Sequence, residues 1–191
     1  MQNRLKQLCI YLPAVLTVLF LSACENDLNK VKAIAAADAT KPIQRTTGVT
    51  ITLSDSGFVK AQVISPLLIE YATKKDPYKI MPNGVKVISY THDLKEDGNI
   101  IADTGYYYDQ KQLIVFRKNV VATKSDGTVY RSEELIWDQA KKQVYSNKKV
   151  RMTKVGGDEM TGTSFVSDDK LSNPVFQNST AIIHVDDNLT H

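Results

Sequence analysis

The sequence predicts an all-β fold in which antiparallel sheets form an open β-jellyroll, a V-shaped two-sheet sandwich. Three observations predict it. Apolar and polar residues alternate with a period of two from Gly48 onward, β-branched and aromatic residues dominate that region, and turn sequences rich in Asp, Asn and Gly interrupt it. Such alternation is typical of strands with one buried face. An ordinary closed β-sandwich is the alternative architecture.

Residues 1–23 have the organisation of a secretory signal peptide. Arg4 and Lys6 precede an apolar run of about 14 residues from Leu8 to Leu21, and small residues follow. The run is shorter than the roughly 20 residues that a transmembrane helix needs. The sequence Leu-Ser-Ala-Cys that ends at Cys24 resembles the lipobox of bacterial lipoproteins, which implies that Cys24 is lipidated and becomes the first mature residue. We therefore expect a lipid-anchored peripheral protein.

The rest of the chain divides into a tether and one domain. Residues 24–45 carry the acylated cysteine and an alanine-rich stretch without a wide apolar face, which favours a flexible spacer. Residues 46–188 are predicted to form the β-domain, and residues 189–191 a short tail. Removal of residues 1–23 takes away two positive charges, so the formal net charge falls from +3 to +1. A basic nucleic-acid binder is therefore not expected.

Several segments of the domain have clear strand patterns. Residues 50–53, 85–87, 129–132 and 150–153 each alternate in polarity. Residues 66–71 are ambiguous, and we assign them to a strand. No disulfide is expected, because Cys9 leaves with the signal peptide and Cys24 is consumed by acylation. The hydrophobic core alone must then stabilise the fold.

The turn sequences recur about every 30 residues. The first series is Asp97-Gly98, Asp126-Gly127, Gly156-Gly157-Asp158 and Asp187-Asn188. Two further series run in step with it: Tyr108-Asp109, Trp137-Asp138 and Ser167-Asp168, and then Asn119-Val120, Lys149-Val150 and Thr180-Ala181. This register predicts an internal repeat of two strands per unit, in which each unit buries its apolar face by stacking on its neighbour.

The sequence offers little for catalysis. The three histidines, His92, His184 and His191, have no second histidine or cysteine at ligand spacing, so no metal site is expected. Neither a nucleophile elbow nor a phosphate-binding loop is present. Glu133 and Glu134 are adjacent on a predicted strand and would point to opposite faces. We therefore expect a non-enzymatic protein without a cofactor.

Aromatic residues suggest a second kind of site. Tyr106, Tyr107, Tyr108, Trp137 and Tyr145 could form a carbohydrate or lipid contact surface, although such residues more often pack in cores and at sheet rims. Alternation places Tyr106 and Tyr108 on one face of a strand and Tyr107 on the other. Only part of this set can line one site.

Several short motifs occur in order along the chain. They are Cys24-Glu25-Asn26, Ser54-Asp55-Ser56-Gly57, Met81-Pro82-Asn83-Gly84-Val85, Ile101-Ala102-Asp103 with Tyr108, Arg117-Lys118-Asn119-Val120-Val121, Ser132-Glu133-Glu134-Leu135-Ile136-Trp137-Asp138, Val150 and Thr161-Gly162. Together they resemble the LptC family, the periplasmic component of the lipopolysaccharide export machine, in the lipoprotein form found in Bacteroidetes-type bacteria. The resemblance covers roughly residues 24–169.

The resemblance implies a β-jellyroll of the OstA-like kind at the periplasmic face of the inner membrane, and the sequence leaves the outer membrane open as the alternative destination of the lipid anchor. A protein of this type receives lipopolysaccharide from the inner-membrane LptB, LptF and LptG transporter and passes it to the periplasmic bridge protein LptA. Family members commonly carry a transmembrane helix where this chain has its lipobox. The resemblance also implies that the first strands face the transporter and that the last strand, around residues 180–185, docks the bridge protein. Exposed sheet edges could couple such proteins by strand addition.

Two other functions fit the same composition. The chain could be a structural or interaction lipoprotein of envelope assembly, or a carbohydrate-binding β-sandwich. For the lipid-transfer function, alternation selects candidates for an inward-facing lipid groove. These are Ile51, Leu53, Val59, Ala61, Val63, Val85, Val87, Ala102, Tyr106, Leu113, Val115, Val129, Leu135, Trp137, Val144, Val150, Met152 and Val166. A register slip of one residue would invert a strand's assignment.

Overall fold

The structure is a computed structural model that describes Lys30, residues 44–72 and residues 76–184. The predicted signal peptide, Cys24, nearly all of the tether and the tail lie outside the described residues. The chain divides into two compact units, residues 1–40 and residues 41–191, and every described strand belongs to the second. None of the helical residues described belongs to a helix long and apolar enough to cross a membrane.

The described domain is all-β, as predicted. Four of its strands are long, with ten or more residues: β1 (Gln44–Asp55), β2 (Phe58–Tyr71), β7 (Leu113–Lys124) and β8 (Val129–Asp138). The shorter strands are β3 (Tyr78–Met81), β4 (Val85–Tyr90), β5 (Glu96–Ala102), β6 (Thr104–Tyr108), β9 (Gln143–Ser146), β10 (Val150–Thr153), β11 (Glu159–Gly162), β12 (Ser164–Asp168), β13 (Val175–Gln177) and β14 (Thr180–Ile182). One 3-10 turn, η1 (Asp109–Lys111), joins β6 to β7. The ambiguous residues 66–71 form the second half of β2.

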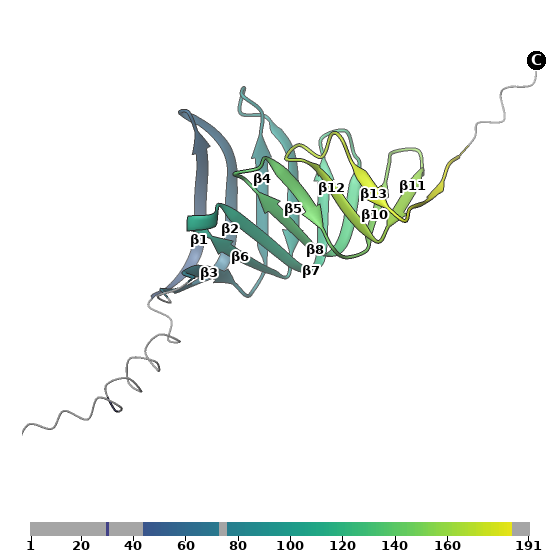
Figure 1. The fold of residues 1–191 in the computed structure, drawn as a ribbon. Helices are drawn as coiled ribbons and strands as arrows, with labels where there is room; N and C mark the ends of the chain where they lie inside the picture. Colours follow the sequence, from purple (N-terminus) through teal and green to yellow (C-terminus); the bar gives the residue numbers. More distant parts are fainter. Residues whose placement is uncertain (1–29, 31–43, 73–75, 185–191) are drawn as a thin grey trace, which may run out of the picture. The chain divides into compact units, whose positions relative to one another are not determined.

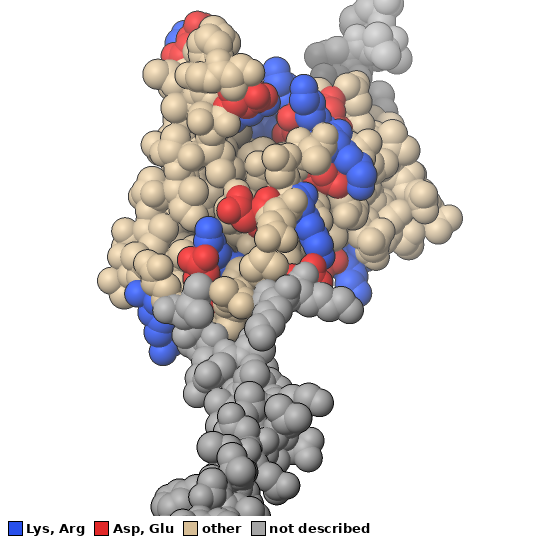
Figure 2. Space-filling model, turned by 60° about the vertical axis from the view of Figure 1, so that its left-hand side comes forward, with Lys and Arg blue, Asp and Glu red and all other residues tan. Residues whose placement is uncertain are grey.

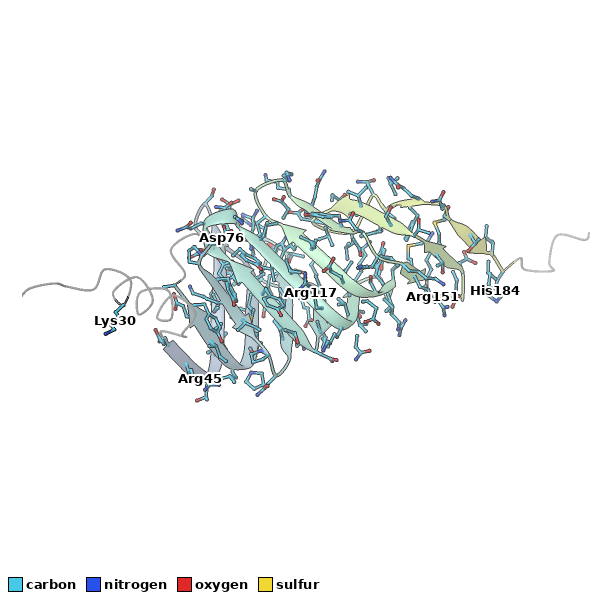
Figure 3. All side chains as sticks on the ribbon, turned by 60° about the horizontal axis from the view of Figure 1, so that its bottom comes forward. Lys30, Arg45, Asp76, Arg117, Arg151 and His184 are labelled. Atoms are coloured by element: carbon cyan, nitrogen blue, oxygen red, sulfur yellow. The ribbon has the colours of Figure 1, made fainter. Side chains whose placement is uncertain are left out.

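All fourteen strands join one antiparallel sheet that folds into two layers (Figure 1). The long strands belong to both layers, because their two halves pair with different neighbours: residues 113–117 of β7 pair with β6, and residues 121–124 pair with β5. Layer I has the order β1-β2-β3-β6-β7-β8-β9-β12-β13, and layer II has the order β1-β2-β4-β5-β7-β8-β10-β11-β14. Strand β1 and the C-terminal strands therefore lie at opposite ends of the sandwich, near the labelled Arg45 and His184 (Figure 3).

The chain crosses between the layers at a row of corners. Neighbouring corners are joined by backbone hydrogen bonds: the Gly84 N–H donates to the Asp103 carbonyl at 2.8 Å, and the Asp103 N–H donates to the Lys118 carbonyl at 3.1 Å. Lys118 and Asn119 have left-handed φ angles of 65° and 50°, and the pairing of β7 with β8 shifts register there. Such a bulge bends the strand and re-aims its side chains. The corners thus fold one sheet into two layers.

The predicted repeat of about 30 residues is present in the structure. Gln112, Lys142 and Leu171 occupy equivalent turns of layer I with φ angles of 50°, 53° and 55°. The Gln139 N–H donates to the Gln112 carbonyl, and the Asp169 N–H donates to the Lys142 carbonyl, both at 3.0 Å. Each turn is therefore bonded to the next one. The Asn119, Lys149 and Thr180 series marks the points where the chain starts its layer II strands.

One predicted turn is wrong. Asp97 and Gly98 lie within β5, and the connection between β4 and β5 falls at residues 91–95. Gly98 is required for close packing, because a Cβ atom there would come within 2.6 Å of the Thr123 carbonyl oxygen on β7. A glycine inside a strand can mark a close backbone approach as well as a turn.

The inner faces of the two layers meet in one hydrophobic core. Its largest fully buried side chains include Tyr130, Phe116, Met81, Ile114 and Leu135, each at most 1% exposed. These residues come from both layers, which confirms that the layers pack face to face as a sandwich. The core is consequently continuous from the β2 region to the β12 region.

Candidate functional site, an interlayer cavity

A cavity of about 470 Å³ lies between the layers. Its apolar lining comes from inner faces on both sides: Val87 and Ile100 in layer II, and Trp137 and Val144 in layer I. Most ligand pockets have volumes of roughly 300–1,000 Å³ and are lined mainly by apolar side chains. In size and lining, the cavity is suited to an apolar ligand.

The mouth of the cavity lies between the turns of the two layers. The β1–β2 turn supplies Ser56, the start of β2 supplies Phe58, and the turn between β12 and β13 supplies Lys170 and Leu171. The ring of Phe58 lies 3.8 Å from that of His92 between centroids. Phe58 is 48% exposed although it is large and apolar. An exposed aromatic side chain at the mouth of an apolar cavity is available for contact with a ligand.

Charged pairs surround this mouth. Lys60 Nζ lies 2.9 Å from Asp55 Oδ2, and Lys124 Nζ lies 2.8 Å from Asp126 Oδ2. Hydrogen bonds from Lys60 and Ser56 lower the pKa of Asp55, and those from Lys124 and Thr128 lower the pKa of Asp126 to about 2. Both carboxylates are therefore ionised at neutral pH. On the face of the molecule shown in Figure 2, Lys and Arg are interspersed among Asp and Glu.

Trp137 contributes an unsatisfied donor to the cavity. It lines the cavity, and its Nε1–H is buried without a hydrogen-bond partner, as is the hydroxyl of Ser167 on the same face of layer I. An unpaired buried donor costs about 1–3 kcal/mol. A ligand acceptor, such as an ester or amide carbonyl, could recover that cost. Trp137 is also the single tryptophan of the chain.

The structure places most of the predicted groove residues on inner faces. Four of them, Val59, Val87, Trp137 and Val144, line the cavity. Ile51, Leu53, Ala61, Val63, Val85, Ala102, Leu135, Val150 and Met152 also face inward, but they belong to the packed core around it. Their contact with lipid stays a prediction.

For five candidates the inward assignment is wrong. Tyr106, Leu113, Val115 and Val166 lie on the outer face of layer I, and Val129 lies on the outer face of layer II. Their chain neighbours face the core instead: Ile114, Phe116, Tyr130 and Phe165 are each at most 3% exposed.

Two physical causes explain these errors. Leu113 to Phe116 are four consecutive apolar residues, so alternation cannot select a face. In β8, Ser132 and Leu135 both face inward although they are three residues apart. Strict alternation would place them on opposite faces, and the register shift at the corner accounts for the difference. A further residue at Thr163 does the same between β11 and β12, where Gly162 and Phe165 both face inward. A corner therefore inverts the alternation that held before it.

Three of the misassigned side chains, Tyr106, Val115 and Val166, belong to an apolar row on the outer face of layer I. Strand pairing aligns Ile69, Ile80, Tyr106, Val115, Ile136, Tyr145, Val166 and Val175 from β2 to β13. Arg117 borders the row: its guanidinium lies 5.3 Å from the centre of the Tyr106 ring, and its Nε donates to Glu134 Oε2 at 2.9 Å (Figure 3). Both faces of layer I are thus apolar in places.

The predicted division of Tyr106, Tyr107 and Tyr108 between the two faces of a strand is confirmed. Tyr106 and Tyr108 lie on the outer face of β6, and Tyr107 lies on the inner face, where its hydroxyl donates to Asp109 at 3.0 Å. On the outer face, Tyr78 stacks on Tyr71 at 5.1 Å and lies 5.9 Å from Tyr108. Trp137 is on the opposite side of the layer, so these aromatic residues do not form one site.

Among the cavity residues that sequence reasoning missed are three large apolar ones, Phe58, Ile100 and Leu171. Phe58 follows a turn, Ile100 adjoins the misassigned turn at Gly98, and Leu171 lies in a turn that carries little other apolar content. An apolar residue inside a polar turn was the available signal for Phe58 and Leu171. Within the described residues, no group of three or more His, Cys, Asp or Glu side chains could hold a metal ion.

Comparison with known proteins gives one family. The family model described as LptC, lipopolysaccharide-assembly, LptC-related, matches residues 10–181. No curated protein matched the chain.

Proposed function

The chain belongs to the LptC-related family of lipopolysaccharide assembly, and from this premise we propose that it carries lipopolysaccharide by holding the acyl chains in the interlayer cavity. The family assigns the chain to lipopolysaccharide transport, in association with the transport machinery. The cavity supplies the proposal for where the lipid is held. Lipid A acyl chains would lie on the apolar floor between the layers, and the sugar and phosphate part would stay at the mouth.

The chemistry of the cavity supports this assignment. Each methylene removed from water contributes about 0.8 kcal/mol, so ten buried methylenes contribute about 8 kcal/mol to binding. At the mouth, the ion pairs of Lys60 and Lys124 are partly exposed, and pairs of this kind contribute little stability. Exchange of a carboxylate partner for a lipid phosphate would therefore cost little. No bond is made or broken in this process, so it requires no catalytic residue.

The ends of the sandwich support the proposed partners. Among the strands that the structure describes, β1 pairs only with β2, and β13 and β14 each pair with a single strand. Such edges present unpaired backbone groups that can accept a strand from another protein. We propose that the transporter formed by LptB, LptF and LptG docks at the β1 edge and that an LptA-like bridge protein docks at the β13 and β14 edges. A lipid on Cys24 would hold the protein at the periplasmic face of the inner membrane.

A photocrosslinking experiment tests the proposed cargo. We expect a photoreactive phenylalanine analogue at Phe58 to crosslink lipopolysaccharide in cells, because this residue lies at the mouth of the cavity. The matched control is the same analogue at Ile101. Ile101 is 47% exposed, against 48% for Phe58, but it lies on the outer face of layer II. Crosslinks of equal yield at both positions, or at neither, would contradict the proposal.

A further inference from the structure

The interlayer space is filled at the β12–β13 side of the cavity. Tyr130 from layer II meets Phe165 from layer I, with ring centroids 5.4 Å apart, and Phe165 meets Phe176 at 5.2 Å. Tyr130 is 1% exposed and Phe165 is 3% exposed. None of these three described residues lines the cavity. The cavity therefore does not continue between the layers to strand β13.

Leu171 covers the boundary between the cavity and these aromatic rings. It lines the cavity, is 7% exposed, and has a left-handed φ of 55°. A bulky residue rarely adopts this backbone conformation, and it persists where surrounding contacts hold it. The equivalent turns of the repeat place Gln112 and Lys142 in the same conformation, with φ angles of 50° and 53°, so the turn itself fixes the backbone of Leu171.

The turn that carries Leu171 is held together by the Asp168 carboxylate. Its Oδ1 accepts the N–H groups of Lys170 at 3.1 Å and Ser172 at 2.8 Å, and its Oδ2 accepts the Asn173 side-chain amide at 2.6 Å. Burial raises the pKa of Asp168, but these hydrogen bonds outweigh burial and keep the pKa below its usual value. The ionised carboxylate thus makes residues 169–172 one compact unit.

One side-chain hydrogen bond ties this unit to the opposite layer. The Tyr130 hydroxyl on β8 donates to the Leu171 carbonyl oxygen at 3.1 Å, across 41 residues of sequence. Burial raises the pKa of Tyr130 to about 12, so the hydroxyl keeps its proton at neutral pH. The turn is otherwise joined to layer I, where the Asp169 N–H donates to the Lys142 carbonyl.

We propose that residues 169–172 form a gate between the interlayer cavity and the β13 end, and that the Tyr130 hydroxyl is its latch. Displacing the gate breaks the latch and withdraws one leucine side chain, while the rest of the core keeps its contacts. An open gate would expose the packed rings of Tyr130 and Phe165 to the cavity. What passes the gate rests on the proposed function, but the opening is a property of the protein without lipid.

Fluorescence of Trp137 tests the gate directly, because this single tryptophan lies in the cavity that the gate borders. In the full chain without lipid, we expect Tyr130→Phe to raise the acrylamide quenching constant of Trp137 at least twofold. Tyr107→Phe is the matched control: it also removes a tyrosine hydroxyl and one hydrogen bond, but outside the cavity. Equal quenching in wild type, Tyr130→Phe and Tyr107→Phe would overturn the proposal.

A second variant keeps the test valid if Tyr130→Phe folds poorly. Leu171→Gly removes the covering side chain, keeps the backbone carbonyl, and suits the left-handed φ of 55°. It should also raise the quenching of Trp137 at least twofold, and unchanged quenching would contradict the gate. Because no lipid is present, these outcomes are independent of crosslinking at Phe58. Absence of the lipopolysaccharide crosslink at Phe58, together with increased quenching of Trp137 in the variants, would contradict the proposed cargo and support the proposed gate.

Discussion

Phe116→Ala is expected to lower the free energy of unfolding by about 3–5 kcal/mol, which is typical of a large buried aromatic side chain replaced by alanine. Phe116 is 0% exposed and lies between Gly105 on β6 and Leu135 on β8. Gly105 has no side chain that could fill the space, because a Cβ there would already come within 3.0 Å of Val85 and Met81. The substitution should therefore leave a cavity.

The adjacent residue supplies the control. Val115→Ala is on the outer face of the same strand and should cost about 1 kcal/mol or less. Urea unfolding of both variants, followed by circular dichroism, measures the difference in the free energy of unfolding. The slope m of that free energy against urea concentration should stay constant. An equal loss of stability in the two variants would contradict the assignment of faces in β7.

Val59→Arg is expected to weaken binding of lipid A at least tenfold, which corresponds to about 1.4 kcal/mol. Val59 lines the cavity and is only half-buried. An arginine there can extend its guanidinium toward the mouth, so the fold should tolerate it. The added charge and volume would occupy the place of the acyl chains.

Ile101→Arg adds the same side chain to the outer face of layer II and should leave the affinity within about twofold, well under 1 kcal/mol. Titration calorimetry with purified lipid A measures both variants against wild type. An undiminished affinity of Val59→Arg would mean that lipid binds elsewhere. Thermal unfolding of the same samples checks that the variants are folded.

Much of the fold could be predicted because its signals are local. Alternation identified strands in regions such as residues 85–87 and 150–153, and turn residues such as Gly127 and Asp138 set the repeat. Each repeat places a left-handed residue in the same turn of layer I, and Asp residues accept hydrogen bonds there. Asp138 Oδ1, for example, accepts the Lys141 N–H at 2.9 Å. The residues that make these interactions lie within a few positions of one another, so they can be recognised in the sequence.

The inward and outward faces of several strands could not be predicted, because no interaction between neighbouring residues in the sequence marks the corners. One extra residue at a corner, as between Ser132 and Leu135, inverts the later assignments. The apolar row on the outer face of layer I removed the contrast that alternation needs, most clearly at Leu113 and Val115. Exposed apolar side chains such as Val175, at 59%, cannot be told from core residues by composition alone.

The cavity and its gate depend on contacts between distant segments. Phe58 and Trp137 line one cavity from opposite layers, and Tyr130 reaches Leu171 across 41 residues. No spacing in the sequence indicates these contacts. The sequence predicted that inward-facing apolar residues would surround a groove. The way in which the two layers pack determines which of these residues line the cavity.

Quenching of Trp137 by brominated lipid tests the central claim most directly. Bromine atoms on acyl chains quench tryptophan fluorescence only at close contact, and Trp137 is the single tryptophan, located in the cavity. With lipid A brominated on its acyl chains, the account predicts loss of most of the Trp137 emission, and no such loss with unbrominated lipid A. Unchanged emission while brominated lipid A co-elutes with the protein in gel filtration would show that the acyl chains bind outside the cavity.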